Sequence, residues 1–405
     1  MYRFEYFFFL QLVFDLIFEN LAKMPQKEFV DPCSDCREFE SILTQRNRRL
    51  CQSVDPVHHP TFKKDKLADH VMFQCRDCYR RAVSLKVLRR TENYRLRKHP
   101  FPRTGPLNLA FPLSYGLSST VLLHMLHDQL DAQLAKPRGP PGYNLHVLII
   151  EPSTICPSSP SHEEGFEAAQ KCFPLFSFTR VSFHDIFDYV PDILETMSQF
   201  AGSSFVDNPS LSNQERLAAF RASISTATSR ADVDYILMNR LVVAFAKRMD
   251  CRAVLWGDSD SKLAAKTLAN VAKGRGSSVT WQVSDGMSPS GLEFSFPLRD
   301  LFTTELQNYA TFFPELSKII IRDEPPSETT LTKNLSIDEL MMRYVQTQGE
   351  KYPGVMLNVT RTAAKLDPSQ APMTAQCSLC GSAVLESDGE SGFCYGCIRS
   401  RPESS

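Results

Sequence analysis

Between residues 107 and 273, apolar strand-like segments alternate with longer segments of helical periodicity. Strand-like patterns occur in LNLAFPL (107–113), LHVLIIEPS (145–153), FSFTRVSF (176–183) and RAVLWGD (252–258). Helical patterns cover 117–135, 162–173, 213–227, 232–249 and 260–273. Strands that alternate with helices in this way form parallel sheets covered by helices on both faces. The sequence therefore predicts an α/β domain with a parallel sheet.

The first strand runs into a short loop of small residues, SYGLSST, before the first helix. At such a corner, backbone N–H groups and the helix dipole can hold a phosphate. The residues suited to that role are Ser114, Gly116, Ser118, Ser119 and Thr120. A plain strand–helix corner capped by serine explains the same residues, since serine is a favoured N-cap. Both interpretations remain open at this point.

Eight of the twelve cysteines form four C-x-x-C pairs, which is the spacing of tetrahedral zinc sites. A chain of 405 residues does not need disulfides for its core, so the pairs indicate metal in a reducing compartment. The predicted ligands are Cys33, Cys36, Cys75 and Cys78 in an N-terminal module and Cys377, Cys380, Cys394 and Cys397 in a C-terminal module. Free or redox-active thiols are the alternative.

A predicted helix over 79–99 carries a cluster of basic residues with a single acid, Glu92. The formal net charge of the chain is −1, so nucleic-acid contact would have to come from such a local patch. Clustered arginine and lysine neutralise phosphates, whereas a solvated helix face normally mixes in acids. We expect RNA or DNA contact from Arg80, Arg81, Lys86, Arg89, Arg90, Arg95, Arg97 and Lys98.

The first 23 residues are rich in phenylalanine but are interrupted by acids, which argues against a signal peptide or a membrane span. A mis-assigned start, an amphipathic helix and a weak anchor remain as interpretations, and we expect no stable membrane association and a cytoplasmic location. The predicted organisation is an uncertain extension (1–30), a cysteine module with the basic helix (31–100), the α/β domain (101–330), a helical extension (331–366) and the C-terminal zinc module (367–405).

Three segments together resemble a known family. SYGLSST resembles the S-G-G-x-D-S loop of ATP-dependent tRNA-modifying enzymes, VLWGDSDSKLAAKTLANVAKGRGSSVTWQVSD resembles their second signature, and FPLRDLFTTELQNY resembles their Pro-Leu-Arg-Asp segment. With the flanking cysteine pairs, their order is similar to that of the cytoplasmic tRNA 2-thiolation protein 2 family. The resemblance implies a PP-loop (adenine nucleotide alpha hydrolase-like) fold, with Gly257 and Asp258 at a turn that faces the nucleotide or simply caps a helix.

The family resemblance also implies a function. Members of this family are partners of a catalytic thiolase subunit, and the heterodimer makes 5-methoxycarbonylmethyl-2-thiouridine at the wobble position of tRNAs for Lys, Glu and Gln. ATP adenylates the uridine oxygen, and sulfur comes from a thiocarboxylated ubiquitin-related modifier. Tyr115 and Ser118 stand where the catalytic relatives carry a glycine and an aspartate. The mid-chain cysteines Cys156, Cys172 and Cys251 form no C-x-x-C pair.

These departures predict a non-catalytic subunit that binds tRNA and zinc, with ATP bound weakly or only in the partner. Two alternatives remain. The chain could itself be an ATP-dependent uridine-adenylating sulfurtransferase, or a zinc-bearing nucleic-acid adaptor.

Overall fold

The computed structural model describes residues 43–46, 71–74, 76–94, 105–135, 141–156, 161–321, 335–366, 375–384 and 392–402. The chain forms two compact units, Met1–Ala82 and Val83–Ser405. In the first unit, β1 (Leu43–Arg46) pairs antiparallel with β2 (Val71–Gln74). The basic helix α2 spans Arg76–Arg90 and is followed by the short helix η1 (Glu92–Tyr94). The helix predicted over 79–99 therefore begins three residues earlier and ends at Arg90.

The second unit is built on a six-stranded sheet in the order β5-β4-β3-β6-β8-β7. Five neighbouring strands are parallel, and only β7 at one edge runs antiparallel to its neighbour. Their bounds are β3 Leu107–Pro112, β4 Tyr143–Ile150, β5 Ser177–Val181, β6 Ala253–Leu255, β7 Gly286–Met287 and β8 Glu293–Ser295. The predicted α/β class is confirmed, but a wholly parallel sheet is wrong because of β7, which is too short to give a pattern in the sequence.

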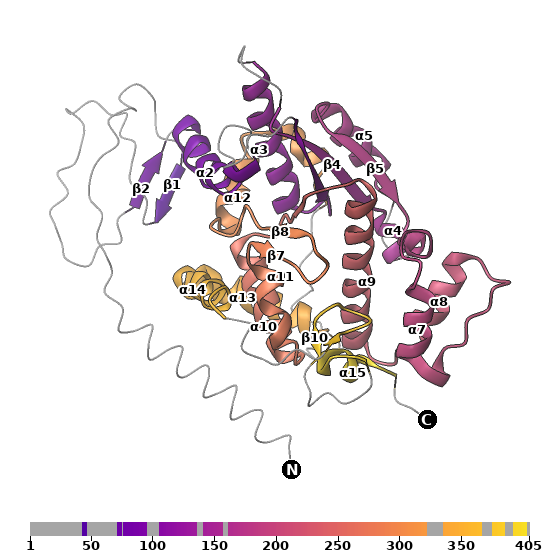
Figure 1. The fold of residues 1–405 in the computed structure, drawn as a ribbon. Coiled ribbons are helices and arrows are strands. Elements are labelled where there is room, and N and C mark those ends of the chain that lie inside the picture. Colours follow the sequence, from indigo (N-terminus) through magenta and orange to yellow (C-terminus); the bar gives the residue numbers. More distant parts are fainter. Residues whose placement is uncertain are drawn as a thin grey trace, which may run out of the picture. The chain divides into compact units, whose positions relative to one another are not determined.

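Helices connect the parallel strands, and the larger ones follow the predicted pattern. The helices are α3 Leu117–Leu134, α4 Pro152–Ile155, α5 Glu163–Cys172, α6 Ile186–Tyr189, α7 Ile193–Ala201, α8 Asn213–Ser223, α9 Ala227–Arg248, α10 Asp260–Ala272, α11 Val279–Val283 and α12 Thr303–Ala310. Right-handed crossovers place α3 and α5 on one face of the sheet and α9 and α10 on the other. Figure 1 shows these elements in chain order by colour.

The long helix α9 illustrates why the sequence folds in this way. Its apolar residues Ile236, Leu237, Leu241, Val242 and Phe245 recur at helical spacing and are all buried. The Thr226 side chain caps its start by accepting a hydrogen bond from the Ser229 N–H. This face joins α6 and α7 in the largest hydrophobic cluster of the described chain.

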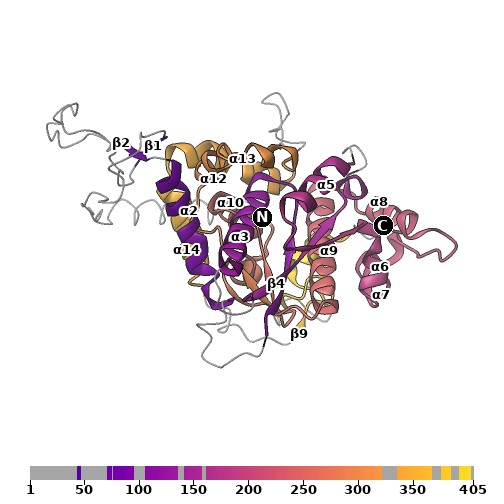
Figure 2. The ribbon, with the colours of Figure 1, turned by 90° about the horizontal axis from the view of Figure 1, so that it is seen from above.

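Two further helices, α13 (Ile337–Lys351) and α14 (Pro353–Ala363), pack on α10. The contact is between the small side chains of Ala264 and Ala265 and the apolar side chains of Val345 and Met356. Small residues on α10 let the two helices approach closely. In both views α13 and α14 lie on the flank of the second unit opposite α7 and α8 (Figures 1 and 2).

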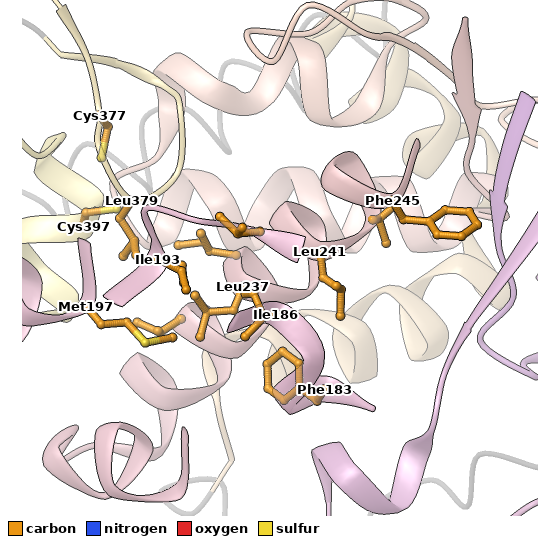
Figure 3. Close-up of a cluster of buried hydrophobic side chains, with 14 of the residues drawn as sticks. Phe183, Ile186, Ile193, Met197, Leu237, Leu241, Phe245, Cys377, Leu379 and Cys397 are labelled. Atoms are coloured by element: carbon orange, nitrogen blue, oxygen red, sulfur yellow. The ribbon is translucent and has the colours of Figure 1, made fainter. Parts of the chain in front are cut away.

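The C-terminal cysteine module consists of the hairpin β9 (Ala375–Gln376) and β10 (Ala383–Val384) and the helix α15 (Tyr395–Ser400). The module shares the main hydrophobic cluster instead of forming a core of its own. Figure 3 shows Leu379 and Cys397 beside Ile193, Met197 and Leu237 of this cluster. Among the described residues, no helix has the length and apolar character needed to cross a membrane.

Candidate functional site

The order of strands defines a topological switch point at the carboxyl-terminal edge of the sheet, called the crevice below. From β3 the chain adds β4 and β5 on one side, and then returns to place β6 on the other side of β3. In open α/β sheets, ligands bind where the strand order reverses in this way. Both predicted loops, Ser114–Thr120 after β3 and Gly257–Asp258 after β6, lie at this point. A Cβ on Gly257 would come within 2.7 Å of the Ser119 Cα, so the two loops are in direct contact.

The first loop forms the start of α3. Gly116 is the N-cap, and the side chains of Ser118, Ser119 and Thr120 are buried. The Ser119 hydroxyl donates to the Gly116 carbonyl at 3.0 Å and lies 3.1 Å from the Ser114 hydroxyl. The first N–H groups of a helix have no partner within the helix, so this end of α3 is suited to an anion. The hydroxyls of Ser114 and Ser119 themselves serve the local structure of the turn.

Tyr115 has a backbone φ of 57°, in the left-handed region that favours glycine. The loop thus keeps the backbone conformation of a glycine loop, although a tyrosine occupies the position. The Tyr115 ring is buried and packs edge-on against His162, with 4.7 Å between ring centroids. Its hydroxyl is buried without a hydrogen-bond partner among the described residues, and burial raises its pKa. Tyr115 therefore anchors the loop to the protein interior.

Two lysines of α10, which belong to no sequence motif, lie at the crevice. The Lys266 ammonium lies 2.6 Å from the Asp258 carboxylate. Burial alone would raise the pKa of Asp258, but Lys266 outweighs it and holds that pKa below its usual range. Lys262 extends toward the first loop, with its Nζ 3.4 Å from where a Cβ on Gly116 would lie. Spacing on a helix was the only sequence signal for these lysines.

This arrangement bears on nucleotide binding. A helix N-terminus beside the Lys262 ammonium fits a phosphate group. The carboxylate of the second loop fits a magnesium ion less well, because Asp258 is already paired with Lys266. The residues present therefore suit an anion, and neither predicted loop has an unpaired carboxylate that could bind a magnesium ion.

Asp260, the first residue of α10, has a buried carboxyl group beside the same crevice. Its Oδ1 accepts a hydrogen bond from the Thr360 hydroxyl of α14 at 2.9 Å, and its Oδ2 has no partner among the described residues. Burial raises the pKa of Asp260 to about 6. The helical extension is thus joined to the edge of the crevice by a polar contact as well as by its apolar face.

The basic helix divides into two groups of side chains. Lys86 donates to the Asp300 carbonyl at 2.9 Å and to the Glu305 carboxylate at 3.3 Å. Arg90 pairs with the carboxylates of Asp300 and Asp285. Asp300 belongs to the Pro-Leu-Arg-Asp segment after β8, so the C-terminal half of α2 is bound to the crevice edge of the sheet. In contrast Arg80, Arg81 and Arg89 are exposed, while Arg95, Arg97 and Lys98 lie outside the described residues.

The four C-terminal cysteines form a cluster. The Sγ atoms of Cys377, Cys380, Cys394 and Cys397 all lie within 4.8 Å of one another, and three of the four residues are buried. The Cys377 N–H bonds the Ser382 carbonyl, and the Gly381 N–H bonds the Cys377 carbonyl, which forms the tight turn of a metal knuckle. Gly381 has a φ of 73°, as that turn requires. Four converging thiolates fit a tetrahedral zinc ion.

A buried arginine binds this cluster to the α/β domain. Arg275, which follows α10, donates to the sulfur of Cys397 at 3.4 Å and to that of Cys394 at 3.7 Å. The same guanidinium pairs with Asp232 of α9, which also accepts from Lys273 at 3.0 Å. Burial alone would raise the pKa of Asp232, but the two cations outweigh it and lower that pKa. Gly396 permits this contact, because a Cβ there would lie 2.5 Å from the Arg275 Cγ.

The cysteine cluster and the crevice lie at opposite ends of α10. The helix starts at Asp260 beside the crevice and, after 13 residues or about 20 Å, ends near Arg275. A metal in this cluster is therefore remote from the Ser114–Thr120 loop and suited to a structural role. Of the predicted N-terminal ligands, only Cys78, half-buried on α2, is among the described residues. It is disulfide-bonded in the structure, and a disulfide sulfur cannot be a zinc thiolate at the same time. Cys33, Cys36 and Cys75 lie outside the described residues, so the N-terminal zinc site stays a prediction.

The three mid-chain cysteines do not form a cluster. Cys156 is exposed, Cys172 is half-buried, and Cys251 is buried, which raises the pKa of its thiol to about 12. No metal-binding group other than the C-terminal cluster occurs in the part of the chain that the structure describes. These thiols offer no shared ligand set for an iron–sulfur cluster.

Comparison with a solved structure supports the fold. The U34-tRNA thiolase NcsA from Methanococcus maripaludis, solved with its 4Fe–4S cluster, superposes with a TM-score of 0.50 over 78% of this chain and 86% of its own. The two sequences are only 14% identical, so this likeness concerns the fold alone.

Comparison with known sequences is closer. A protein of Aspergillus oryzae named cytoplasmic tRNA 2-thiolation protein 2 is 65% identical over 385 residues, which are 94% of this chain and all of the relative. A protein of Aspergillus clavatus with the same name is 58% identical over 94% of this chain and all of its own length. The family profile described as cytoplasmic tRNA 2-thiolation protein 2 matches residues 336–393, which include α13, α14 and the first cysteine pair. The chain belongs to the cytoplasmic tRNA 2-thiolation protein 2 family.

Proposed function

We propose that this chain is the tRNA-binding, non-catalytic subunit of a heterodimeric thiolase that converts the wobble uridine of tRNAs for Lys, Glu and Gln to its 2-thio form. In this proposal a homologous partner subunit carries out the ATP-dependent step, with sulfur from a thiocarboxylated ubiquitin-related modifier. The observation that carries the role in tRNA 2-thiolation is the 65% identity to a relative named for that process, over the full length of the relative. Because the relatives are named cytoplasmic, we propose the same compartment, where zinc thiolates stay reduced.

Three features of the crevice support a non-catalytic role. Tyr115 replaces a glycine and is buried, Asp258 is paired with Lys266, and no iron–sulfur ligand set lies among the described mid-chain cysteines. An enzyme that adenylates uridine needs to hold a magnesium nucleotide and to stabilise charge on the transferring group. The first loop has the left-handed backbone at Tyr115 that favours glycine, but the carboxylate of the second loop is paired with Lys266.

The exposed arginines of α2 support tRNA binding. Arg80, Arg81 and Arg89 are free of the ion pairs that Lys86 and Arg90 make within the second unit. We expect Arg89→Glu to weaken tRNA binding several-fold and to lower the dependence of affinity on salt. Arg90→Glu should instead lower the stability of the fold, because it breaks ion pairs to Asp285 and Asp300. Filter binding over a salt series, with thermal unfolding of both variants, separates the two effects. Equal tRNA affinity for the wild type and Arg89→Glu would remove this assignment.

A second candidate function, an uridine-adenylating enzyme, is favoured by one observation. The Lys262 ammonium points toward Gly116, at the N-terminus of α3, where a phosphate would lie. ATP–pyrophosphate exchange on the isolated chain decides between the two. We expect no exchange without the partner subunit and exchange when both are mixed with tRNA. Exchange by the chain alone that is lost in Lys262→Ala would establish the second candidate in place of the first.

A further inference from the structure

A second cavity of about 570 Å³ lies apart from the crevice, between α9, the turn of the β7–β8 hairpin and the first cysteine loop. The turn at Ser288–Ser290 precedes β8, and Lys247 lies in the last turn of α9 just before β6. Both positions are at the amino-terminal edge of the sheet, whereas the crevice is at the carboxyl-terminal edge. The volume is in the range of sites that hold a nucleotide-sized ligand.

The lining of this cavity includes aromatic and amide side chains. Tyr189 and Trp281 supply aromatic surface, and neither is fully buried. Asn239 supplies a half-buried amide group, whereas the buried Gln282 amide already accepts a hydrogen bond from Asn270 at 2.7 Å. Planar rings and amides are what proteins use to stack and to read the edges of unpaired bases.

One unpaired cation lies at the mouth of the cavity. Arg240 is neutralised by Asp192 at 2.8 Å and also donates to the Ser378 carbonyl of the cysteine loop at 2.7 Å. Lys247 lines the cavity, is exposed and has no ion-pair partner among the described residues. The Lys247 ammonium can pair with the phosphate of a phosphodiester.

We propose that this cavity binds one unpaired nucleotide of an RNA, with its base between Tyr189 and Trp281 and its phosphate at Lys247. The Asn239 amide contacts the edge of the base. The cavity is too small for a duplex, so the site selects single-stranded RNA. The proposal rests on the proposed function for the identity of the RNA, a tRNA, and gives the chain an RNA contact on the edge opposite the phosphate loop. The cysteine loop has a direct role here, because it forms one wall of the cavity.

The test uses the full metal-loaded chain and a fluorescent single-stranded RNA octamer, with binding followed by anisotropy. We expect Lys247→Glu to weaken binding about tenfold or more and to lower the salt slope by about 0.7. Asn239→Ala should weaken binding about fivefold through loss of a hydrogen bond to the base. The matched control is Lys171→Glu, an equal charge reversal on exposed α5, which should bind like the wild type. A blunt RNA duplex should bind less tightly than the octamer.

Three results would overturn the proposal: wild-type affinity in both cavity variants, equal loss in the Lys171→Glu control, or displacement of the octamer by an acidic peptide that binds in a Lys247-dependent way. The last result would assign the cavity to a protein tail. The octamer assay does not involve thiolation. The proposed function fails if the wobble uridine is thiolated in cells that lack the chain. The cavity proposal fails on the octamer results above, so the two outcomes are distinguishable.

Discussion

Tyr115 provides a quantitative test of what holds the loop between β3 and α3 in its conformation. Burying a tyrosine side chain removes about 150–250 Å² of its accessible surface from water. This burial stabilises the fold by about 4–6 kcal/mol at most. Its left-handed backbone costs about 1–2 kcal/mol, which a glycine would recover. We therefore expect Tyr115→Gly to lower the free energy of unfolding by about 2–4 kcal/mol.

The matched control is Tyr115→Phe, which keeps the ring and removes the hydroxyl. Because that hydroxyl is buried without a partner among the described residues, we expect this variant to be as stable as the wild type or more stable by up to about 1 kcal/mol. The assay is urea unfolding followed by tryptophan fluorescence. Both tryptophans, Trp256 and Trp281, lie in the second unit, so the signal reports the domain that contains Tyr115.

Two results would refute the reasoning. If Tyr115→Gly were as stable as the wild type, the ring would not anchor the loop. If Tyr115→Gly gained ATP–pyrophosphate exchange in the isolated chain, the tyrosine would be a block on an otherwise complete site, and the paired Asp258 would not limit the chemistry.

Three further predictions concern the carboxyl group of Asp260, the contact of Gly257 with Ser119, and the metal content of the cysteine sites. In the native state the pKa of Asp260 is about 6, above its ordinary value of 3.8. The preference of the folded state for the protonated Asp260 carboxyl stabilises the fold below about pH 4, and this stabilisation is lost as pH rises to about 6. Asp260→Asn should therefore stabilise the fold at pH 7 by about 3 kcal/mol at most, with no gain near pH 4, as measured by urea unfolding at the two pH values. Gly257→Ala should lower stability by about 1–3 kcal/mol, since its Cβ would lie 2.7 Å from the Ser119 backbone. The control Gly354→Ala, which has open space on α14, should be neutral or stabilising. Elemental analysis should find two zinc ions in each chain, one for each predicted site, and one in Cys394→Ser.

Each of these predictions has a contradicting outcome. A pH-independent effect of Asp260→Asn would mean that the carboxyl group does not titrate between pH 4 and 6. A fully stable Gly257→Ala would mean that the two loops separate without cost. Iron in place of zinc, or an unchanged metal content in Cys394→Ser, would contradict a structural zinc site at the C-terminal cluster.

The sequence predicted those parts of the fold that have strong local patterns. The strand β4 lies within three residues of its predicted bounds, and α9 ends one residue before its predicted end but begins five residues earlier than predicted. Apolar spacing determines which face each of these elements buries. The C-terminal cysteine cluster follows from spacing in the same way. The short strand β7 carries no such pattern, and its direction is set by its pairing with β8.

The charge of the candidate site was less predictable. Asp258 was selected as a group facing a nucleotide, but its pairing with Lys266 depends on the position of α10 against the loop. The basic helix shows the same limit, since local charge does not reveal that Lys86 and Arg90 pair with acids more than 190 residues away in sequence. Arg275 gives no signal as a neighbour of the thiolates, because tertiary packing alone brings it there.

The most direct test of the proposed role is mass spectrometry of the wobble uridine in tRNAs for Lys, Glu and Gln from cells in which the gene is deleted. We expect 2-thiolation to disappear in the deletion and to return when the full chain is supplied. It should also return with Lys262→Ala, because the proposed function places no catalytic step in this crevice. Intact 2-thiolation in the deletion strain would contradict a role for this chain in tRNA 2-thiolation.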